Sequence, residues 1–322
     1  MPRYVLGRFF QAFPLLLGVV TIVFVLIHLA PGDPVLALVG DFPAPEEYVR
    51  KVREEFGLDR PLIEQYVRYV GNLARGEFGY SFVQRRPVLQ VIGERAAATG
   101  LLTGTALVVA TLLGVGLGLI AARRPSTVLD ATVSGAAVVG FSVPVFWVGQ
   151  LLILLFAVTL GWLPAQGMVS LRVGPTGWDR VLDVASHLVL PATALALRLV
   201  AMTTRLTRAS LLEVLGQEFI RTAEAKGAGP RRVLGRHALP NALLPLVTFV
   251  GYNLGFLLAG SALIETVFGW PGVGRLLYDS VFTRDYPVLL GIFLMVSLSV
   301  VLANLLTDLL YAYLDPRIRH AR

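Results

Sequence analysis

Six long apolar stretches take up most of the 322 residues, and each is about long enough for a helix that crosses a bilayer. They run over residues 9–30, 97–122, 128–160, 188–204, 242–265 and 288–313. Hydrophobic residues make up 55% of the chain and charged residues 15%, whereas soluble proteins carry about 25% charged residues. A soluble core of this size does not bury so much apolar surface. The sequence therefore predicts an all-α polytopic membrane protein with six transmembrane helices.

Two of these stretches carry additional signals. The first ends in Pro31-Gly-Asp-Pro34 and is longer than the apolar core of a cleaved signal peptide, which predicts a retained helix. The third is interrupted by Ser142-Val-Pro144, which predicts one tilted or kinked helix, or a helix followed by a short re-entrant segment.

Basic residues gather in alternate loops, as they do when positive loops stay in the cytoplasm. If both termini are cytoplasmic, the two short external loops hold only Arg172, Arg180, Arg275 and Arg284. The internal loops hold many more basic residues, above all the loop 205–241. This bias predicts six helices with both ends inside. With this topology, the chain divides into an N-terminus with the first helix (1–30), a small external segment (31–95) and a membrane core (96–322).

The external segment is polar and too short for an enzyme domain. Residues 45–56 and 61–73 place apolar side chains on one helical face, and we expect two amphipathic helices there. We interpret the segment as a small cap on the external face.

The polar stretch with the clearest sequence pattern lies near the centre of the chain, from Glu218 to Asn241. Ile220, Ala223 and Gly227 share one helical face, and Gly227 with the following Gly and Pro residues is expected to end that helix. A second helix is expected to begin near Arg231 and to lead back into the membrane. A helix and turn of this kind, lying beside a membrane, suits docking to a soluble partner.

The segment Arg221-Thr-Ala-Glu-Ala-Lys-Gly227, followed by Leu239-Pro240, resembles the cytoplasmic loop of permease subunits of ATP-binding-cassette importers. That family has Glu-Ala-Ala, three residues, Gly, nine residues, Ile, one residue and Leu-Pro. Arg221, Thr222 and His237 stand where Glu, Ala and Ile are usual. The role of the missing acidic residue therefore does not carry over. The form of residues 221–227 looks like the peptide-importer branch.

Further motifs resemble the first permease subunit of the dipeptide, oligopeptide and nickel importers, and they follow one another in the same order. They are Leu29-Ala-Pro-Gly-Asp-Pro34, Phe56-Gly-Leu-Asp-Arg-Pro61, Gly76-Glu-Phe-Gly-Tyr-Ser81, Val145-Phe-Trp-Val-Gly149, Leu160-Gly-Trp-Leu-Pro164, Glu265-Thr-Val-Phe-Gly-Trp-Pro-Gly-Val-Gly-Arg275, Arg284-Asp-Tyr-Pro287 and Tyr311-Ala-Tyr-Leu-Asp-Pro-Arg317. The resemblance covers nearly the whole chain. It implies the type I importer permease fold in a bacterial inner membrane.

The resemblance also implies partners: a second homologous permease subunit, two cytoplasmic ATPase subunits and an external substrate-binding protein. ATP and Mg would be bound by the ATPases, and this chain would need no cofactor and no metal. In this interpretation the ATPase docks on a coupling loop formed by Glu218, Arg221, Thr222, Ala223, Glu224, Ala225, Lys226, Gly227, Arg231, Arg232, Leu239 and Pro240.

Several chemistries have no signal in the sequence. It has no phosphate-binding loop of the G-x-x-x-x-G-K-[ST] type, no G-x-S-x-G and no histidines at metal-ligand spacing. The chain is therefore not expected to be the ATPase or another enzyme, or to bind nucleic acid. The alternative is an ion- or proton-coupled secondary transporter, which predicts internal repeats and carboxylates at helix midpoints, and neither is visible. A membrane-embedded enzyme would need a polar cluster that is also not visible.

Two polar residues within the apolar stretches are candidates for a substrate path. Arg198 near mid-membrane should face protein or water, or its side chain snorkels to the cytoplasmic surface near Arg205. Asn253 is a path candidate or a packing residue, and Glu265 is expected at a membrane interface. The solute stays open between dipeptides, longer peptides, nickel chelates and sugars.

Overall fold

The computed structural model describes residues 2–29, 47, 50, 59–81, 83–170, 174, 176–256 and 262–314. The helices are α1 (Pro2–Leu29), α4 (Leu62–Ala74), α5 (Val88–Arg123), α6 (Val128–Ser142), α7 (Val145–Leu152), α8 (Trp178–Leu215), α9 (Glu218–Ala225), α10 (Pro230–Arg232), α11 (Leu239–Ala242), α12 (Leu244–Gly255), α13 (Ala262–Val267), α14 (Val273–Phe282) and α15 (Tyr286–Leu314). Two further segments are π-helical, η1 (Ile153–Thr159) and η2 (Val233–Ala238), and strands β1 (Tyr80–Ser81) and β2 (Arg86–Pro87) form an antiparallel hairpin.

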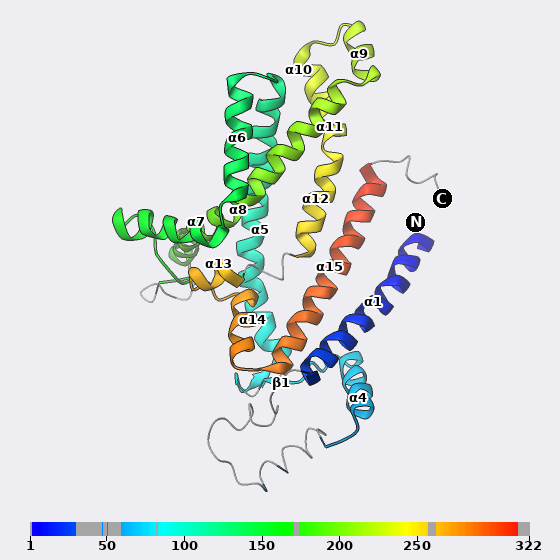
Figure 1. Cartoon of the computed structure of the whole chain (residues 1–322), viewed down its shortest axis with the longest axis vertical. Coiled ribbons are helices and arrows are strands. Elements are labelled where there is room, and N and C mark those ends of the chain that lie inside the picture. Colours follow the sequence, from blue (N-terminus) through cyan, green and yellow to red (C-terminus); the bar gives the residue numbers. More distant parts are fainter. Residues whose placement is uncertain are drawn as a thin grey trace.

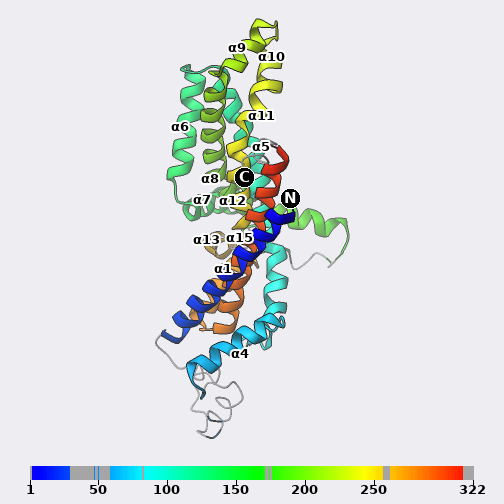
Figure 2. The ribbon, with the colours of Figure 1, turned by 90° about the vertical axis from the view of Figure 1, so that its right-hand side faces the viewer.

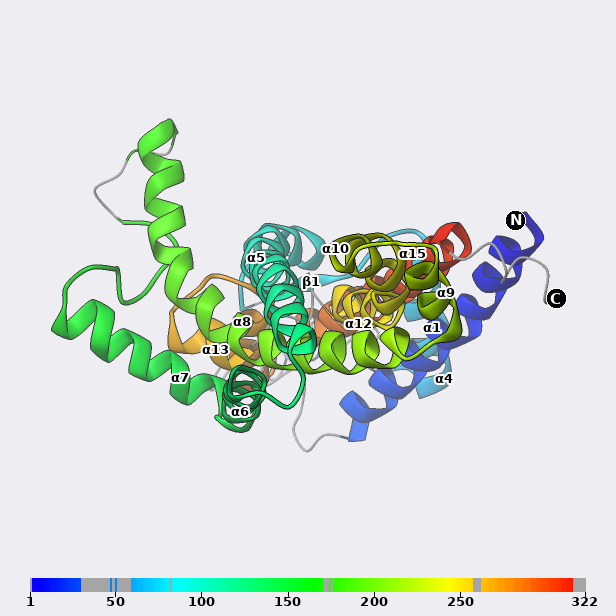
Figure 3. The same cartoon turned by 90° about the horizontal axis from the view of Figure 1, so that it is seen from above.

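The long helices form two groups that run roughly along the longest axis (Figure 1). One group holds α5, α6 and α8, and the other holds α12, α15 and α1. Helix α9 lies at one end of the molecule and α4 at the other (Figures 1 and 2). Seen from above, the arrangement is elongated, with α7 at one side and α1 at the opposite side (Figure 3).

Helices α5 and α8 make the most extensive contact between any two described elements. Small residues of α5 recur every four positions on the face toward α8, which lets the two backbones approach closely. A Cβ atom added to Gly114 would overlap the side chain of Thr203, and one added to Gly118 would lie 2.7 Å from Cβ of Thr207. The central helix pair therefore depends on the missing side chains of these two glycines.

The chain bends sharply between α6 and α7, at Ser142-Val-Pro144, where the sequence predicts a kink or a re-entrant segment. The two helix axes differ by 98°, and α7 lies across the direction of α6 (Figure 1). Val143 has extended dihedral angles, φ −79° and ψ 131°, because the ring of Pro144 disfavours a helical conformation at the residue before it. The predicted break is confirmed.

Three described helices, α5, α8 and α15, are long and apolar enough to cross a membrane. Up to five spans result when α6 with α7–η1, and α10–α11 with α12, are each counted as one bent span. In α1, the described apolar part covers 13–26. The predicted helical fold is confirmed, whereas the number of six spans, the side of each terminus and the division at residues 30 and 95 stay predictions.

Two of the predicted apolar spans differ in extent from the helices of the structure. Helix α8 begins ten residues before 188 and ends eleven residues after 204. Apolar composition marks the part of a helix that suits lipid, whereas its backbone hydrogen bonds continue into polar turns. The stretch 242–265 is not one helix, because α12 ends at Gly255 and Glu265 belongs to α13. Glu265 is fully buried in protein, and its expected depth at a membrane interface stays a prediction. Hydropathy does not distinguish a membrane span from a short helix packed inside the protein.

Of the two amphipathic helices predicted in the external segment, the one at 61–73 is confirmed as α4. The one predicted at 45–56 lies outside the described residues apart from Glu47 and Arg50. The motif Pro31-Gly-Asp-Pro34 and the basic tail 315–322 also lie outside them.

Candidate functional site

Helix α9 ends in a turn that glycine adopts most easily. Gly227 has φ +82°. Its N–H donates to the carbonyl of Glu224 at 2.8 Å, and the N–H of Ala228 donates to the carbonyl of Ala223 at 3.1 Å. This pair of bonds is the Schellman motif. The predicted end of the helix at Gly227 is confirmed, and Pro230 then begins α10.

One buried side chain fixes α9 to the bundle. Ile220 is 2% exposed. It belongs to a cluster with Ala122 at the end of α5, Leu211 near the end of α8, and Val233 and Leu234 in η2. Both central helices and the returning chain therefore meet under α9. Because protein interiors are close-packed, a displacement of α9 is transmitted to these helices.

The other residues of the predicted coupling loop between Glu218 and Gly227 lie mostly on the surface. Exposed are Glu218, Arg221, Thr222, Glu224, Ala225, Lys226 and Gly227, and Ala223 is half-buried. Ile220 and Ala223 share the face that turns toward the bundle, so the free face is the opposite one. Arg231 and Arg232 are exposed on α10 and add positive charge at the same end of the molecule (Figure 1).

Leu239 and Pro240 lie apart from that free face. They begin α11, which lies between α10 and α12 (Figure 1). Leu239 is half-buried and Pro240 is exposed. The amide of Asn241 donates to the carbonyl of His237 at 2.7 Å and supports the helix there. From this position, Leu239 and Pro240 connect η2 to α12 and do not contribute to the free surface of α9.

A partly buried ion pair ties α6 to α8 and was not predicted from the sequence. Nε and Nη2 of Arg208 lie 2.5 and 2.7 Å from the two carboxylate oxygens of Asp130. The same carboxylate accepts hydrogen bonds from the Ser126 N–H at 2.9 Å and the Ser134 hydroxyl at 3.3 Å. Such a bidentate arrangement fixes both position and orientation. The sequence signal that could have indicated this pair is Asp130 itself, a single carboxylate at the start of an apolar helix.

Arg198 lies deep in α8. It is the only Arg, Lys, Asp or Glu between Asp183 and Arg205, a stretch of about 30 Å in a helix. Its Cζ lies 5.5 Å from the ring centroid of Phe141, within the range of a cation–π interaction. The side chain is exposed, and no carboxylate of the described residues pairs with it. The guanidinium therefore stays at the level of Phe141, next to the bend between α6 and α7.

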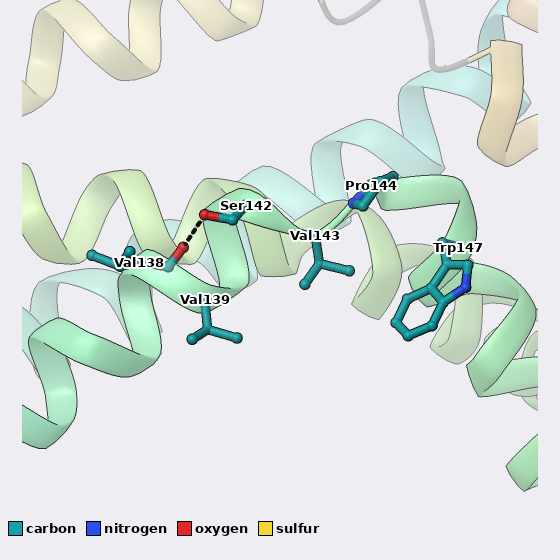
Figure 4. A pocket seen from close by; sticks show the side chains of 6 residues that line it. All are labelled: Val138, Val139, Ser142, Val143, Pro144 and Trp147. Carbon is teal, nitrogen blue, oxygen red and sulfur yellow. Dashed lines mark hydrogen bonds between the residues drawn. The ribbon is translucent and has the colours of Figure 1, made fainter.

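The bend itself forms an apolar groove of about 480 Å³. Figure 4 shows the side chains around it, which are Val138, Val139, Ser142, Val143, Pro144 and Trp147. The hydroxyl of Ser142 donates to the carbonyl of Val138 at 2.8 Å, so this polar group is satisfied within α6. The groove offers apolar contact without charge.

Asn253, the second predicted path residue, is half-buried in α12. Its side-chain amide donates to the carbonyl of Phe249 in the same helix at 2.7 Å. No hydrogen bond of the described residues joins it to Arg198. The structure does not bring the two predicted path residues together.

A buried carboxylate holds the glycine-rich turn before α14. Glu265 accepts hydrogen bonds from the Thr99 hydroxyl at 3.0 Å and the Arg275 N–H at 2.9 Å. The Thr99 oxygen in turn accepts from the Val273 N–H at 2.7 Å. Two amides at the start of α14 are thereby satisfied. A Cβ at Gly272 would overlap the Glu265 carboxylate, which explains the glycine there.

A second carboxylate joins the turn before α15 to the β-hairpin. Asp285 is 4% exposed and accepts a hydrogen bond from the hydroxyl of Ser81 in β1. Burial raises the pKa of Asp285 above its usual value, although the hydrogen bonds from Ser81 and from the backbone of Val288 oppose this. The folded chain therefore favours the protonated carboxyl more than the unfolded chain does.

Two family models match nearly the whole chain. The model described as binding-protein-dependent transport system inner membrane component matches residues 114–320. The model for the N-terminal part of such membrane components matches residues 1–103.

Full-length relatives carry transport names. The dipeptide transport system permease protein DppB of Escherichia coli (strain K12) is 38% identical over 339 residues, with 100% of both chains covered. The glutathione transport system permease protein GsiC of the same strain is 42% identical over 320 residues, with 99% of this chain and 100% of the relative covered. The oligopeptide transport system permease protein AppB of Bacillus subtilis (strain 168) is 38% identical over 321 residues, with 99% and 100% covered.

A solved structure supports the fold. The MetNI methionine ABC transporter in an inward-facing conformation has a chain that matches 70% of this chain with 97% of its own length. The TM-score is 0.55 at 20% sequence identity. The likeness therefore concerns the fold alone.

Proposed function

Because this chain belongs to the family of inner-membrane components of binding-protein-dependent transport systems, we propose that it is the permease subunit of an ATP-driven importer of dipeptides and oligopeptides. Its place is the bacterial inner membrane. An external binding protein delivers the peptide, and a second homologous permease completes the path. Two cytoplasmic ATPase subunits bind ATP and Mg, and this chain contributes no cofactor and no catalytic residue.

The substrate class rests on the relatives' names. Full-length relatives at 38 to 42% identity are named for dipeptides, oligopeptides and glutathione. These solutes share a peptide backbone and at least one free carboxylate. Peptides are therefore favoured over nickel chelates and sugars.

The coupling proposal rests mainly on how α9 is attached to the membrane helices: one face packs against them and the other is free. Its free face carries Arg221 and Lys226, and Arg231 and Arg232 stand close by on α10. These cations suit acidic residues on an ATPase surface. Its inner face is held by Ile220 against the ends of α5 and α8. Nucleotide binding can shift the permease only if it favours one of two permease states, and α9 is the element through which that preference is transmitted.

The path proposal rests on Arg198. A charge at this depth is expected to face protein or water, and its guanidinium stays beside Phe141, which supports a path role over snorkelling. An unpaired cation suits the carboxylate of a peptide. Asn253, which bonds to its own helix, is a weaker candidate for a path residue.

The need for a second permease is supported by the bend. Backbone that leaves the helical conformation at membrane depth must be covered by protein or line a water-filled cavity. Residues around Val143 and Pro144 face the groove, and Val139 and Trp147 are exposed there. A second subunit placed against α6 and α7 covers this region and completes the path.

No observation favours the secondary-transporter alternative. The buried carboxylates of Asp130 and Glu265 lie near helix ends, and each accepts several fixed hydrogen bonds. Groups held in this way suit structural roles better than proton transfer.

Co-purification tests the proposal. The tagged chain is purified in mild detergent from its native membranes, and the co-purifying subunits and ATP hydrolysis are measured. We expect a second permease and two ATPase copies. Gly227→Trp is expected to abolish ATPase binding and uptake while the chain stays inserted, because a bulky residue fits neither the turn nor a docked partner.

Two further variants separate docking from backbone strain. Ala225→Trp adds bulk on the free face of α9 without a left-handed backbone and is expected to have the same effect. Gly76 has the same φ of +82° and open surroundings, so Gly76→Trp is a matched control that should leave the complex intact. A chain that purifies alone, or normal uptake by Ala225→Trp, would contradict the coupling role.

A further inference from the structure

Helix α4 is amphipathic, and the described part of the chain leaves it largely uncovered. None of its residues is buried. Its apolar side chains occupy one side of the helix, and Glu64, Arg68 and Asn72 lie on the other. A helix with this pattern normally buries its apolar side against another surface.

One edge of the apolar side packs against α1. The hydroxyl of Tyr66 lies 2.6 Å from Oγ1 of Thr21, and Thr21 donates its own proton to the carbonyl of Leu17, so Tyr66 is the donor. The ring of Phe24 lies 5.3 Å from that of Tyr66 and 6.0 Å from that of Tyr69, centroid to centroid. These contacts fix α4 beside α1.

The other edge of the apolar side is open. Ile63 is 78% exposed and Val67 63% exposed. On α1, Ile22 and Leu26 are also exposed, one turn apart and next to the face that carries Thr21. The open side chains of α4 therefore extend an apolar surface that α1 already presents.

The point at which α4 contacts α1 indicates how deep α4 lies relative to the membrane surface. Thr21 lies eight residues before the last residue of α1, which is about 12 Å along a helix. The contact with Tyr66 is therefore not at the end of α1 but well inside it. Helices that lie in a membrane interface bury their apolar face about 5–10 Å into the boundary between headgroups and acyl chains, and α4 reaches such a depth when the C-terminal end of α1 lies at the membrane surface.

The charges of α4 fit the same placement. Glu64 forms ion pairs with Arg60 and Arg68 along one side. That side is opposite to Ile63, so these charges remain among headgroups and water when Ile63 enters the acyl region. Binding proteins and other soluble partners do not explain why the open surface continues along a candidate membrane helix.

We propose that α4 is an interfacial helix whose partner is the lipid bilayer, with Ile63 and Val67 inserted among the acyl chains. It lies at the end of the molecule opposite α9 (Figure 1), so the leaflet is the outer one when α9 is cytoplasmic. The helix then anchors the segment between α1 and α5 to the membrane surface. This inference needs the chain to be in a membrane and does not depend on the coupling role of α9.

Spin-label accessibility tests the placement. The chain has no cysteine, so Ile63→Cys and Asn72→Cys each create a single labelling site on it. The two positions are nine residues apart and lie on opposite sides of the helix. The complete transporter carrying either variant is labelled with a nitroxide and placed in phosphatidylcholine and phosphatidylglycerol bilayers. The unmodified transporter, treated in the same way, gives the background from the other subunits.

Oxygen concentrates in lipid, whereas a nickel chelate stays in water. At position 63 we expect more frequent collisions with oxygen than with the nickel chelate, and at position 72 the reverse. Low accessibility to both reagents at position 63 would mean that a protein partner covers the helix and would overturn the proposal. Greater accessibility to nickel at position 63 would place it in water and would overturn it as well. The readout reports position and not transport, so it is independent of whether the coupling proposal holds.

Discussion

At the residue scale, Ile220 is the side chain that joins the free face of α9 to the membrane helices. Ile220→Ala removes most of its contacts with Ala122, Leu211 and the η2 residues, a loss of about 2–5 kcal/mol for a buried position. We expect faster amide hydrogen exchange in residues 221–226 and weaker stimulation of ATP hydrolysis by the binding protein. Phe219 is 43% exposed on the same helix, so Phe219→Ala is the control for exchange. Equal exchange in both variants would contradict this attachment.

The carboxyl of Asp285 gives a pH dependence of known sign. Because its pKa is raised in the folded state, its contribution to stability is full below the unfolded pKa of about 4 and is lost as pH rises through the folded pKa. Asn keeps an acceptor for Ser81 and carries no charge. Asp285→Asn should therefore flatten the stability profile above pH 4.

Thermal unfolding in detergent at a series of pH values measures this effect. Asp279→Asn, at an exposed aspartate of α14, is the control. A profile for Asp285→Asn that runs parallel to that of the unchanged chain would show that the carboxyl does not titrate differently in the two states.

Local signals in the sequence identify some of these residues and not others. Gly227 is recognisable because the turn by which a glycine ends a helix is formed by residues adjacent in the sequence. The pair of Asp130 and Arg208 spans 78 residues, and that of Thr99 and Glu265 spans 166. Such pairs are set by packing between distant helices, which one sequence without relatives does not reveal.

At the element scale, the contact of α5 with α8 depends on fit and not on hydrogen bonds. The hydroxyls of Thr203, Thr204 and Thr207 are buried without a hydrogen-bond partner in the described residues. Close approach of the two helices at Gly114 and Gly118 must therefore supply the stabilisation through van der Waals contact.

Two glycines of α5 provide a matched pair for a test. Gly114→Ala places a methyl group on Thr203, and overpacking of this kind typically destabilises by about 1–3 kcal/mol. A Cβ at Gly116 meets nothing within 4 Å, so Gly116→Ala should be neutral or slightly stabilising. Thermal unfolding in the same detergent measures both. Equal thermal-unfolding midpoints for the two variants would argue against a tight fit at Gly114.

The elements themselves were predictable to different degrees. The break at Ser142-Val-Pro144 and helix α4 follow from proline and from hydrophobic periodicity, which are local. The length of α8, the π-helical segments η1 and η2, and the separation of α13 from α12 do not, because they depend on how distant helices pack.

At the scale of the whole molecule, we propose a path shared between two chains, to which this chain would contribute Arg198. Loss of a charged hydrogen bond is worth about 1.5–3 kcal/mol. Arg198→Gln is therefore expected to lower peptide uptake about 10-fold or more, while assembly and basal ATP hydrolysis persist. Arg205→Gln, at an exposed position two turns away, is the control. Uptake measured in membrane vesicles that is equal for both variants would contradict a role for Arg198 in the path.

The bend between α6 and α7 also bears on the order in which the chain matures during synthesis. Helix α6 has 15 residues, or about 22 Å, and is too short to cross a hydrocarbon layer of about 30 Å alone. The break at Pro144 is set locally and forms as soon as this segment is made, but the contacts that hold α7 are not local. Gly149 in α7 packs against Phe268, directly after α13, which is synthesised more than a hundred residues later. The position of α7 therefore becomes fixed only after most of the chain has been made, and truncated chains that end before Phe268 should leave α7 without this packing partner.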